Sequence, residues 1–337
     1  MSEIKKIDLI ENDKKYLIDY ANLVQGIIAN QKEFLNKKQF NIFLKKPSLG
    51  LPLMLPLGLD CFNYDNVKEI FKIDKEDVYK KIFRTKTNFY HAVETFFKYG
   101  NIFCVGAKPK KKYKKIITSI IKINSNLIKK ITNLNNKNKI IGAIQTRNIP
   151  HYGHEIIIKK LLKSCDIVFI NPIIGPKKKG DVRPLVLNKV YKFLISKYYG
   201  QRVRYSPVIA NMFYAGPREA IHHSLIRQQI GFSRFIVGRD HAGSNNVYKP
   251  LDAINLVDSY KSKIKIKVIR HQGSYYCTKC TKVIIKGECK HHHENYNYLK
   301  SISGTEFRSC LKKKILFKFA RPELQKYIYS LKGNLFY

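Results

Sequence analysis

The spacing of apolar residues changes near position 139 of this 337-residue chain. From there on, short apolar runs alternate with segments whose apolar residues recur at helical spacing, in the order KIIGAI, EIIIKKLL and DIVFINP. Strands that alternate with helices in this way form β-α-β units, whose strands are parallel and whose helices cover both faces of the sheet. The alternation continues as far as the strand RFIVG at 234–238. The pattern therefore predicts an α/β fold, with a parallel-sheet domain over 139–272.

The remaining parts of the chain have other patterns. Residues 1–112 combine short apolar runs with Gly and Pro, which predicts a small β-rich domain ending in the strand NIFCVGAKPK. Residues 113–138 are rich in Lys and Asn and place several isoleucines at helical spacing, so we expect a helix or linker there. Residues 273–337 follow the parallel sheet, and we expect them to form a smaller C-terminal subdomain.

Two polar loops follow strands of the predicted sheet. The first reads QTRNIPHYGHE at 145–155, and the second reads GRDHAG at 238–243. Ligands of open parallel sheets bind beyond the carboxyl ends of the strands, so we expect both loops at one site. His151 and His154 stand at the start of a predicted helix, where free backbone N–H groups attract phosphate. Taken alone, each loop is also explained by a helix cap or a solvated turn, but two such loops in one domain favour an anion site.

The chain is strongly basic, but its charge does not select a partner. The 64 Lys and Arg residues exceed the 24 Asp and Glu residues and give a net charge of +40 at pH 7. Such a field concentrates nucleic acid, anionic membranes and small anions alike. Half of the arginines lie between Arg202 and Arg239, and we weight them above the lysines as forked anion ligands. Hydrophobic residues make up 44% of the chain, which excludes a disordered protein.

The N-terminus mixes acids with bases and lacks the apolar core of a signal peptide. The most apolar stretch, PSLGLPLMLPLGLDCF, contains three prolines and is too short to span a bilayer. We therefore expect a cytoplasmic protein without membrane association. Four cysteines stand singly in apolar surroundings and are expected to be reduced thiols: Cys61, Cys104, Cys165 and Cys310.

The other three cysteines precede a run of three histidines. Three thiolates and one imidazole make a tetrahedral zinc set, and C-x2-C spacing lets the first two sulfurs bind one ion from a single turn. We take the ligands to be three cysteines and the last histidine of the run: Cys277, Cys280, Cys289 and His293. The spacing also allows His291 or His292, and a redox dithiol beside incidental histidines is the alternative. Four protein ligands leave no open position, so we expect structural rather than catalytic zinc.

Three motifs together resemble the ATP sulfurylase, or sulfate adenylyltransferase, family: QTRNIPHYGHE, AGPREAIHHSLIR and VGRDHAG. Their order and spacing match the family, and ISGTEFRSCL and FARPELQKYI extend the resemblance over the catalytic half. The resemblance implies a Rossmann-like nucleotidylyltransferase domain at 139–272 and a shortened, PUA-like domain at 1–112. One bacterial and archaeal branch of the family carries a similar zinc module before the SGT segment, as expected here for 273–337. The family also implies a homodimer.

The resemblance implies magnesium-dependent adenylyl transfer. A sulfate oxygen attacks the α-phosphorus of ATP and gives adenosine 5′-phosphosulfate and pyrophosphate, or the reaction runs in reverse. Sulfate needs no base to deprotonate it at pH 7, so the protein has to supply position and charge neutralisation more than acid or base. The residues leave open whether the cell uses the reaction for sulfate assimilation or for sulfur oxidation.

The family pattern also implies roles for single residues. It assigns sulfate to the side chains of Gln145 and Arg147 and to the backbone of Ala242. The residues implied to bind ATP are the polar residues of both loops: Gln145, Thr146, Arg147, Asn148, His151, His154, Gly238, Arg239, Asp240 and His241. The residues implied to be catalytic belong to the first loop: Thr146, Arg147, Asn148, His151 and His154. In the transition state, the two histidines and Arg239 would neutralise charge on the phosphates.

The first loop departs from the family pattern at two positions. The family usually has proline directly after the asparagine, where this chain has Ile149 and then Pro150, and an arginine or similar residue in place of Tyr152. We expect the shifted proline to alter the approach to His151, and the lost cation to weaken phosphate binding. Because every residue with an implied direct contact is present, we still expect an active enzyme.

Near the C-terminus, Ser303 and Glu306 form a capping box that opens a helix presenting Arg308. This SGTxxR segment resembles the second phosphate-binding signature of histidine-loop nucleotidylyltransferases. The alternative is a capped surface helix whose arginine pairs with an acid. In the helix after Gly216, we expect the two adjacent histidines to be packing or surface residues and the two arginines to be structural: His222, His223, Arg218 and Arg227.

Two other functions compete with sulfate adenylyltransferase. One is another histidine-loop adenylyltransferase acting on a phosphopantetheine or nicotinate-like substrate, but this leaves GRDHAG unexplained. The other is a basic, zinc-containing RNA-binding protein, but the 22 tyrosines are spread along the chain instead of forming a stacking platform. An RNA binder would lose affinity steeply with salt and show no turnover of ATP and sulfate. Nucleic acid is therefore not the expected partner.

Overall fold

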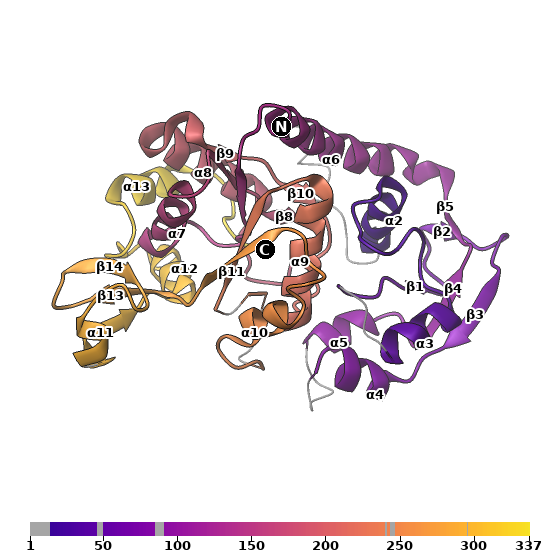
Figure 1. Ribbon diagram of the computed structural model, residues 1–337. Coiled ribbons are helices and arrows are strands. Elements are labelled where there is room, and N and C mark those ends of the chain that lie inside the picture. The colour runs from indigo at the N-terminus through magenta and orange to yellow at the C-terminus, as the bar shows by residue number, and fades with distance from the viewer. Residues whose placement is uncertain (1–13, 46–49, 85–90, 240, 243–246, 295) are drawn as a thin grey trace.

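The computed structural model describes residues 14–45, 50–84, 91–239, 241–242, 247–294 and 296–337 (Figure 1). The second half of the chain is built around a five-stranded sheet in which every neighbouring pair of strands is parallel. Its strands are β6 (Ile141–Ile144), β7 (Ile167–Ile170), β9 (Val203–Tyr205), β11 (Arg234–Gly238) and β12 (Lys267–His271). The predicted α/β fold with a parallel sheet is therefore confirmed.

The strand order β12-β11-β6-β7-β9 places a reversal of direction between β6 and β11. From β6 the chain runs outward through β7 to β9, then returns to β11 and continues outward to β12 on the other side. Ligands of such sheets bind where the order reverses, beyond the carboxyl ends of the two strands. Ile236 of β11 is paired with Ile144 of β6, so the two polar loops leave the sheet side by side.

Alternate residues of these strands enter two hydrophobic cores, one on each face of the sheet. Ala143, Phe169 and Phe235 pack toward α6, α9 and α10, whereas Ile144 and Ile236 pack toward α7, α8, α12 and α13. These helices are α6 (Lys114–Asn135), α7 (Tyr152–Leu162), α8 (Pro184–Tyr198), α9 (Pro217–Ile230), α10 (Asp252–Ser259), α12 (Gly304–Lys312) and α13 (Pro322–Ser330). Three of them, α8, α9 and α13, begin at a proline, whose missing N–H costs nothing in the first turn.

Two further short strands, which follow β7 and β9 along the chain, form a separate parallel pair. It consists of β8 (Ile173–Ile174) and β10 (Val208–Ile209), all four residues of which are buried. The 3-10 turn η4 (Gly200–Arg202) leads into β9. The loops that follow β8 and β10 therefore start from fixed positions next to the main sheet.

The N-terminal part combines short antiparallel strands with helices. Its strands are β1 (Leu55–Pro56), β2 (Phe62–Asn63), β3 (Glu69–Lys72), β4 (Ile102–Val105) and β5 (Lys108–Pro109), ordered β1-β4-β3 and β2-β5. Its helices are α2 (Lys15–Gln25), α3 (Lys37–Lys45), α4 (Lys75–Asp77), the π-helix η2 (Val78–Ile82) and α5 (His91–Phe96). The helices hold more residues than the strands, so the expected β-rich part is a mixed one, because a short apolar run bounded by Gly or Pro fits either element. The PUA-like assignment stays a prediction.

Helix α6, which follows the 3-10 turn η3 (Lys111–Tyr113), packs firmly against both halves of the chain (Figure 1). Ile120 lies in one buried cluster with Ile18 of α2 and Ile209 of β10. The buried Asn124 donates from Nδ2 to Asn22 Oδ1 and to the carbonyl oxygen of Ile209, both at 3.0 Å. The segment expected to be a helix or linker is thus a packed helix, while the exact domain boundaries at 112 and 138 stay predictions. None of the described helices, α6 included, combines the length and apolar character needed to cross a bilayer.

The C-terminal part forms a small antiparallel sheet with the order β14-β13-β15. Its elements are β13 (Ser274–Cys277), β14 (Lys282–Ile285), α11 (His291–Glu294), the 3-10 turn η5 (Tyr296–Tyr298) and β15 (Leu299–Ser301). The Ser303 side chain accepts the N–H of Glu306 at 3.3 Å, which confirms the predicted cap of α12. Three of the four isolated cysteines, Cys61, Cys104 and Cys165, are buried and outside any disulfide, and Cys310 is partly exposed.

Candidate active site

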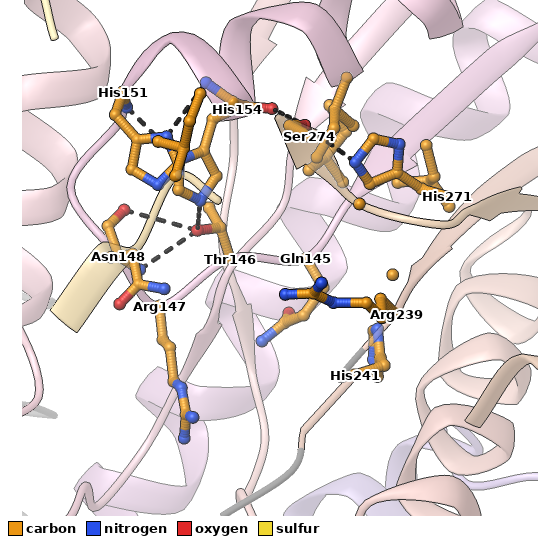
Figure 2. Close-up of a pocket in the computed structure, with 18 of the residues that line it drawn as sticks. Gln145, Thr146, Arg147, Asn148, His151, His154, Arg239, His241, His271 and Ser274 are labelled. Atoms are coloured by element: carbon orange, nitrogen blue, oxygen red, sulfur yellow. Dashed lines mark hydrogen bonds between the residues drawn. The ribbon is translucent and has the colours of Figure 1, made fainter. Parts of the chain in front are cut away.

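A cavity of about 410 Å³ opens where the strand order reverses (Figure 2). It brings together the loop after β6, the loop after β11 and the start of α12. The predicted site residues that line it are Gln145, Thr146, Arg147, Asn148, His151, His154, Gly238, Arg239, His241 and Ala242. Asp240, also predicted, lies outside the described residues. The two predicted loops therefore line one cavity.

The two histidines of the first loop form the N-terminal cap of α7. Nδ1 of His151 accepts the N–H of Gly153 at 3.1 Å, and Nδ1 of His154 lies 3.4 Å from the backbone nitrogen of His151. Because both Nδ1 atoms accept backbone N–H groups, the ring protons belong on the two Nε2 atoms. The ring centres are 4.1 Å apart, and both rings line the cavity.

Burial keeps both imidazoles neutral in the absence of ligand. It lowers the pKa of His154 to about 4 and the pKa of His151 well below its usual value, and the neighbouring His154 lowers the latter further. His154 Nε2 lies 3.3 Å from Oγ1 of Thr146, which accepts the N–H of Asn148 at 3.2 Å and thereby shapes the loop (Figure 2). The pair therefore offers N–H donors to an anion, and a bound polyanion would raise both pKa values.

Gly153 is required by the packing of this cap. A Cβ atom at this position would lie 2.8 Å from Cε1 of His151 and 3.3 Å from Cβ of Ser274. A separation below 3.0 Å is closer than carbon atoms tolerate, so any side chain here has to displace the His151 ring. The glycine thus fixes the position of a predicted catalytic residue.

Gln145 is oriented by a buried arginine, Arg227, that the sequence analysis expected to be structural. Its Oε1 accepts from Nη2 of Arg227 at 2.7 Å and from the backbone N–H of Ile173 at 3.1 Å, so its Nε2 is left to donate. Arg227 is fully buried and also donates from Nε to Oδ1 of Asn171 at 2.9 Å. The expectation that Arg227 is structural was incomplete, because it holds a candidate sulfate ligand.

A buried polar chain connects α9 to the second loop. Nε2 of His241 lies 2.9 Å from Nδ1 of His223, and Nε2 of His223 lies 3.1 Å from Oε1 of Glu219. The Glu219 carboxylate also accepts the N–H groups of Phe213 and Ala215, at 2.9 and 2.8 Å. His223 therefore contacts a site residue, which the sequence analysis missed. His222 is buried and receives the N–H of Leu51 at 3.4 Å, as expected of a packing residue.

Three arginines surround the cavity and give it positive charge. Arg239 donates from Nη1 to the hydroxyl of Tyr275 at 2.7 Å. Arg308 donates from Nη1 to Oδ1 of Asn148 and also lines the cavity, which supports its assignment to the site over a simple surface ion pair. Arg147 extends away from the two histidines, with its Cζ 5.3 Å from the ring centre of Tyr214 (Figure 2). The cations thus approach the cavity from different sides.

Two further lining residues, His271 and Ser274, were not predicted. His271 ends β12, and its Nε2 lies 3.0 Å from Oγ of Ser274, which donates to the carbonyl oxygen of Gly153 at 3.0 Å. Burial lowers the pKa of His271 to about 4. The signal that would have found it is its place at the carboxyl end of the fifth parallel strand, where ligands of such sheets bind.

The two departures from the family pattern lie away from the cavity surface. Ile149 is buried in the core that contains Ile144 and Phe307. Tyr152 lines another cavity, behind α7, where its ring centre lies 6.0 Å from Cζ of Arg321. Tyr152 thus faces away from the candidate phosphate site, and the expected effect of the lost cation on phosphate binding stays a prediction.

The C-terminal cluster has the chemistry of a metal site. One ligand atom from each of four residues lies within 4.8 Å of all the others: Cys277, Cys280, Cys289 and His291. Nδ1 of His291 lies 3.2 to 3.7 Å from the three sulfur atoms. His291, named above as an alternative, thus stands where we had chosen His293, whose side chain lies outside the described residues. Three thiolates and one imidazole fit a four-coordinate structural metal.

The fold and the sequence both have known counterparts. A solved structure described as a hexameric APS kinase from Thiobacillus denitrificans matches 94% of this chain with a TM-score of 0.59 and 12% identity, and this chain spans 61% of that protein. At such an identity the match concerns the fold alone.

Curated relatives share more of the sequence. The sulfate adenylyltransferase of Pyrococcus abyssi is 31% identical over 92% of this chain and 86% of its own length, and that of Persephonella marina is 32% identical over 95% and 89%. The enzyme of the same name from Staphylothermus marinus is 42% identical over 58% of this chain and 50% of its own length. The ATP-sulfurylase family model matches residues 121–330. With both signature loops gathered at one cavity and the Pyrococcus and Persephonella enzymes matching nearly the whole chain, the protein belongs to the ATP-sulfurylase family.

Proposed function

We propose that the chain is a sulfate adenylyltransferase, which converts ATP and sulfate to adenosine 5′-phosphosulfate and pyrophosphate and also catalyses the reverse reaction. The observation that carries the proposal is the meeting of the two signature loops at one cationic cavity, at the position where sheets of this order bind nucleotides. The names of the curated relatives support it. No covalent catalysis is required, because one oxygen of sulfate forms the new bond to the α-phosphorus as the bond to pyrophosphate breaks.

The first loop and α7 would bind the phosphates of ATP. His151 and His154 would donate from Nε2, and Thr146 and Asn148 would keep the loop in shape through the hydrogen bonds described above. Arg239 would approach from the second loop with a planar, charged donor group. Gly238 has open space where a Cβ would stand, so the backbone of the second loop is accessible to a nucleotide.

Sulfate would lie between Gln145, Arg147 and the backbone N–H of Ala242. Nε2 of Gln145 is left to donate because its Oε1 is held by Arg227. These donors neutralise and orient the anion, and no proton has to be moved. The role of the protein is then to hold the attacking oxygen in line with the leaving pyrophosphate.

Two metals belong to the proposal. Mg²⁺ would neutralise phosphate charge, and it would arrive with ATP, because the described residues that line the cavity include no carboxylate to hold it. Zn²⁺ would be bound by Cys277, Cys280, Cys289 and His291 as a structural ion that joins the end of β13, the turns on either side of β14 and the start of α11. A homodimer and a cytoplasmic location stay predictions.

The test is pyrophosphate-dependent formation of ATP from adenosine 5′-phosphosulfate with magnesium, using purified protein. The matched control carries His151→Ala and His154→Ala. We expect robust ATP formation by the wild type and none by the control. A folded, zinc-loaded wild type without activity would contradict the proposal, and salt-sensitive RNA binding by that protein would favour the RNA-binding alternative.

A further inference from the structure

The buried polar chain that starts in α9 reaches the cavity at His241, in the loop after β11. His241 lies beside Arg239 of the same loop (Figure 2). The other two members of the chain, Glu219 and His223, are fully buried, whereas His241 is 8% exposed. A ligand in the cavity therefore meets this chain first at His241.

The two imidazoles of the chain share one hydrogen bond. Nδ1 of His223 and Nε2 of His241 lie 2.9 Å apart. Burial lowers the pKa of both rings well below its usual value, so each ring is neutral and carries a single proton. If His241 donates to His223, Nδ1 of His241 is left without a proton. If His223 donates to His241, the proton of His241 has to stand on Nδ1, and the opposite group faces the cavity.

The carboxylate of Glu219 decides between these two arrangements. Its oxygens accept the backbone N–H groups of Phe213 and Ala215, which suits a carboxylate although burial raises its pKa. Nε2 of His223 lies 3.1 Å from Oε1 of this carboxylate. The contact is bent away from ideal hydrogen-bond geometry, but a negative oxygen at this distance attracts a proton and repels a lone pair. The proton of His223 therefore belongs on Nε2, and His241 has to donate from its own Nε2.

Nδ1 of His241 is then a hydrogen-bond acceptor that is open to the cavity. No described residue donates to it, and it is not cut off from solvent. The three arginines of the cavity and the two histidines of the first loop approach the ligand as donors instead. Fully ionised sulfate and phosphate groups carry no donor that could meet this nitrogen. The donors that ATP does carry are the two ribose hydroxyls and the 6-amino group of adenine.

We propose that Glu219 and His223 are positioning residues, which hold His241 in the tautomer whose Nδ1 accepts a hydrogen bond from the nucleoside part of ATP. The inference rests on the proposed function for the identity of the nucleotide. The hydrogen bond contributes to the selection of ATP against nucleotides that lack the donor group. A ribose hydroxyl and the adenine 6-amino group offer the same chemistry, and the experiment below distinguishes them.

The tautomers can be read in the full chain without substrate. Long-range proton–nitrogen correlation spectra of protein with isotope-labelled histidines distinguish a ring protonated at Nε2 from one protonated at Nδ1. The signals that disappear in His223→Leu and in His241→Leu assign the two rings. We expect both rings to carry their proton on Nε2, and a proton on Nδ1 of His241 would overturn the proposal.

Nucleotide binding tests the use of this acceptor. Competition against radioactive ATP, with magnesium and without sulfate, gives dissociation constants for 2′-deoxy-ATP, 3′-deoxy-ATP and purine riboside triphosphate, each of which lacks one donor group. We expect one of these analogues to bind the wild type about tenfold more weakly than ATP, because it leaves the acceptor unpaired. The identity of that analogue names the donor.

Variants of α9 test whether the acceptor depends on the chain. In His223→Leu, the preference for ATP over that analogue should shrink to about threefold or less, because the His241 ring loses the partner that fixes it. His223→Asn should keep the preference, since its Oδ1 can accept from Nε2 of His241 in place of Nδ1. His222→Leu is the matched control, because His222 is the adjacent buried histidine and bonds to Leu51 instead. It should also keep the preference.

A comparison of nucleotides within one variant cancels any general loss of affinity, which a disturbed cavity would cause for all nucleotides alike. An unchanged preference in His223→Leu, or equal binding of ATP and all three analogues by the wild type, would overturn the proposal. Neither measurement needs turnover, so the two proposals fail separately. A wild type that shows the expected preference but forms no ATP would remove the enzymatic function and leave this recognition standing. An active wild type whose His223→Leu variant keeps the preference would do the opposite.

Discussion

Several side chains of the cavity are held by residues that do not face the ligand. Arg227 is the clearest case, because one fully buried guanidinium bonds to both Gln145 and Asn171. A planar fork satisfies two acceptors at once, whereas a lysine at the same place has a single nitrogen. The orientation of the Gln145 amide, and therefore its ability to donate to sulfate, depends on this arginine.

We expect Arg227→Lys to raise the KM for sulfate by about tenfold, the effect of losing one charge-assisted hydrogen bond, and to change the KM for ATP much less. Steady-state kinetics with each substrate varied in turn measures both constants. Arg218→Lys is the matched control, because Arg218 is a buried arginine of the same helix that contacts Tyr260 outside the cavity. Equal increases in the two variants would show that Arg227 does not act through Gln145.

Residues of the two loops were predictable, and those of α9 were not. Each loop is a continuous polar segment directly after an apolar strand, so the rule on carboxyl ends locates it without any tertiary information. Nearly every residue of α9 is buried, including Glu219, His223 and Arg227. A helix without a solvent-exposed face gives the sequence no contrast between inward and outward positions, and its polar contacts become visible only in three dimensions.

At the scale of elements, the start of α7 depends on the absence of a side chain at position 153. We expect Gly153→Ala to lower kcat on the order of 100-fold, because the new Cβ has to displace the His151 ring. Alanine favours the helix by about 1 kcal/mol over glycine, so the fold should be kept. Lys159→Ala, at an exposed position of the same helix, is the control. A fully active Gly153→Ala enzyme would refute the dependence on the ring position.

The C-terminal sheet has a core of only a few residues around its cysteines, including Tyr275 and Leu299. We therefore expect Cys289→Ser to lower both the zinc content and the melting temperature, whereas Cys310→Ser, outside the cluster, should leave both unchanged. Metal analysis and thermal unfolding test this. A stable, zinc-replete Cys289→Ser protein would contradict the assignment.

The fourth ligand is decided by a pair of variants. His291→Ala should release zinc, because Nδ1 of His291 lies among the three sulfurs, and His293→Ala should retain it. The reverse result would favour His293, the ligand expected from the sequence. Sequence alone could not decide between them, because a run of adjacent histidines offers the same ligand atom at every position.

At the scale of the whole molecule, buried neutral histidines make stability depend on pH. Burial lowers the pKa of His154, His222 and His271 from 6.5 to about 4. Between these values the unfolded chain binds more protons than the folded chain, so stability rises with pH and is lost as pH falls below about 6.5. Each of these groups should cost roughly 2 kcal/mol between pH 7 and pH 5. Urea unfolding at both pH values measures the difference, and equal stabilities would show that these histidines take up protons at pH 5 in the folded protein as they do in the unfolded chain.

The parallel sheet was predictable because its strands are buried on both faces and read as continuous apolar runs. The N-terminal part was less predictable, because its short elements are defined by packing against the rest of the chain. One hydrophobic core contains Leu17 and Cys104 together with Ile141 and Phe169. An element that is stabilised by packing against a distant part of the chain shows little of the hydrophobic periodicity by which a helix or strand is predicted from sequence.

The pairing of β6 with β11 bears on the rate of the proposed reaction. The loop after β6 would hold sulfate and the ATP phosphates, and the loop after β11 would complete both sites. These loops follow two hydrogen-bonded strands, so the distance between their starting points is set by the spacing of strands in a sheet, about 4.8 Å. Folding therefore helps to fix the distance between the two reactants. Part of the translational and rotational entropy that they would lose on coming together is removed when they bind. Such an active site accelerates the reaction by holding a weak nucleophile next to its target, at a high effective concentration.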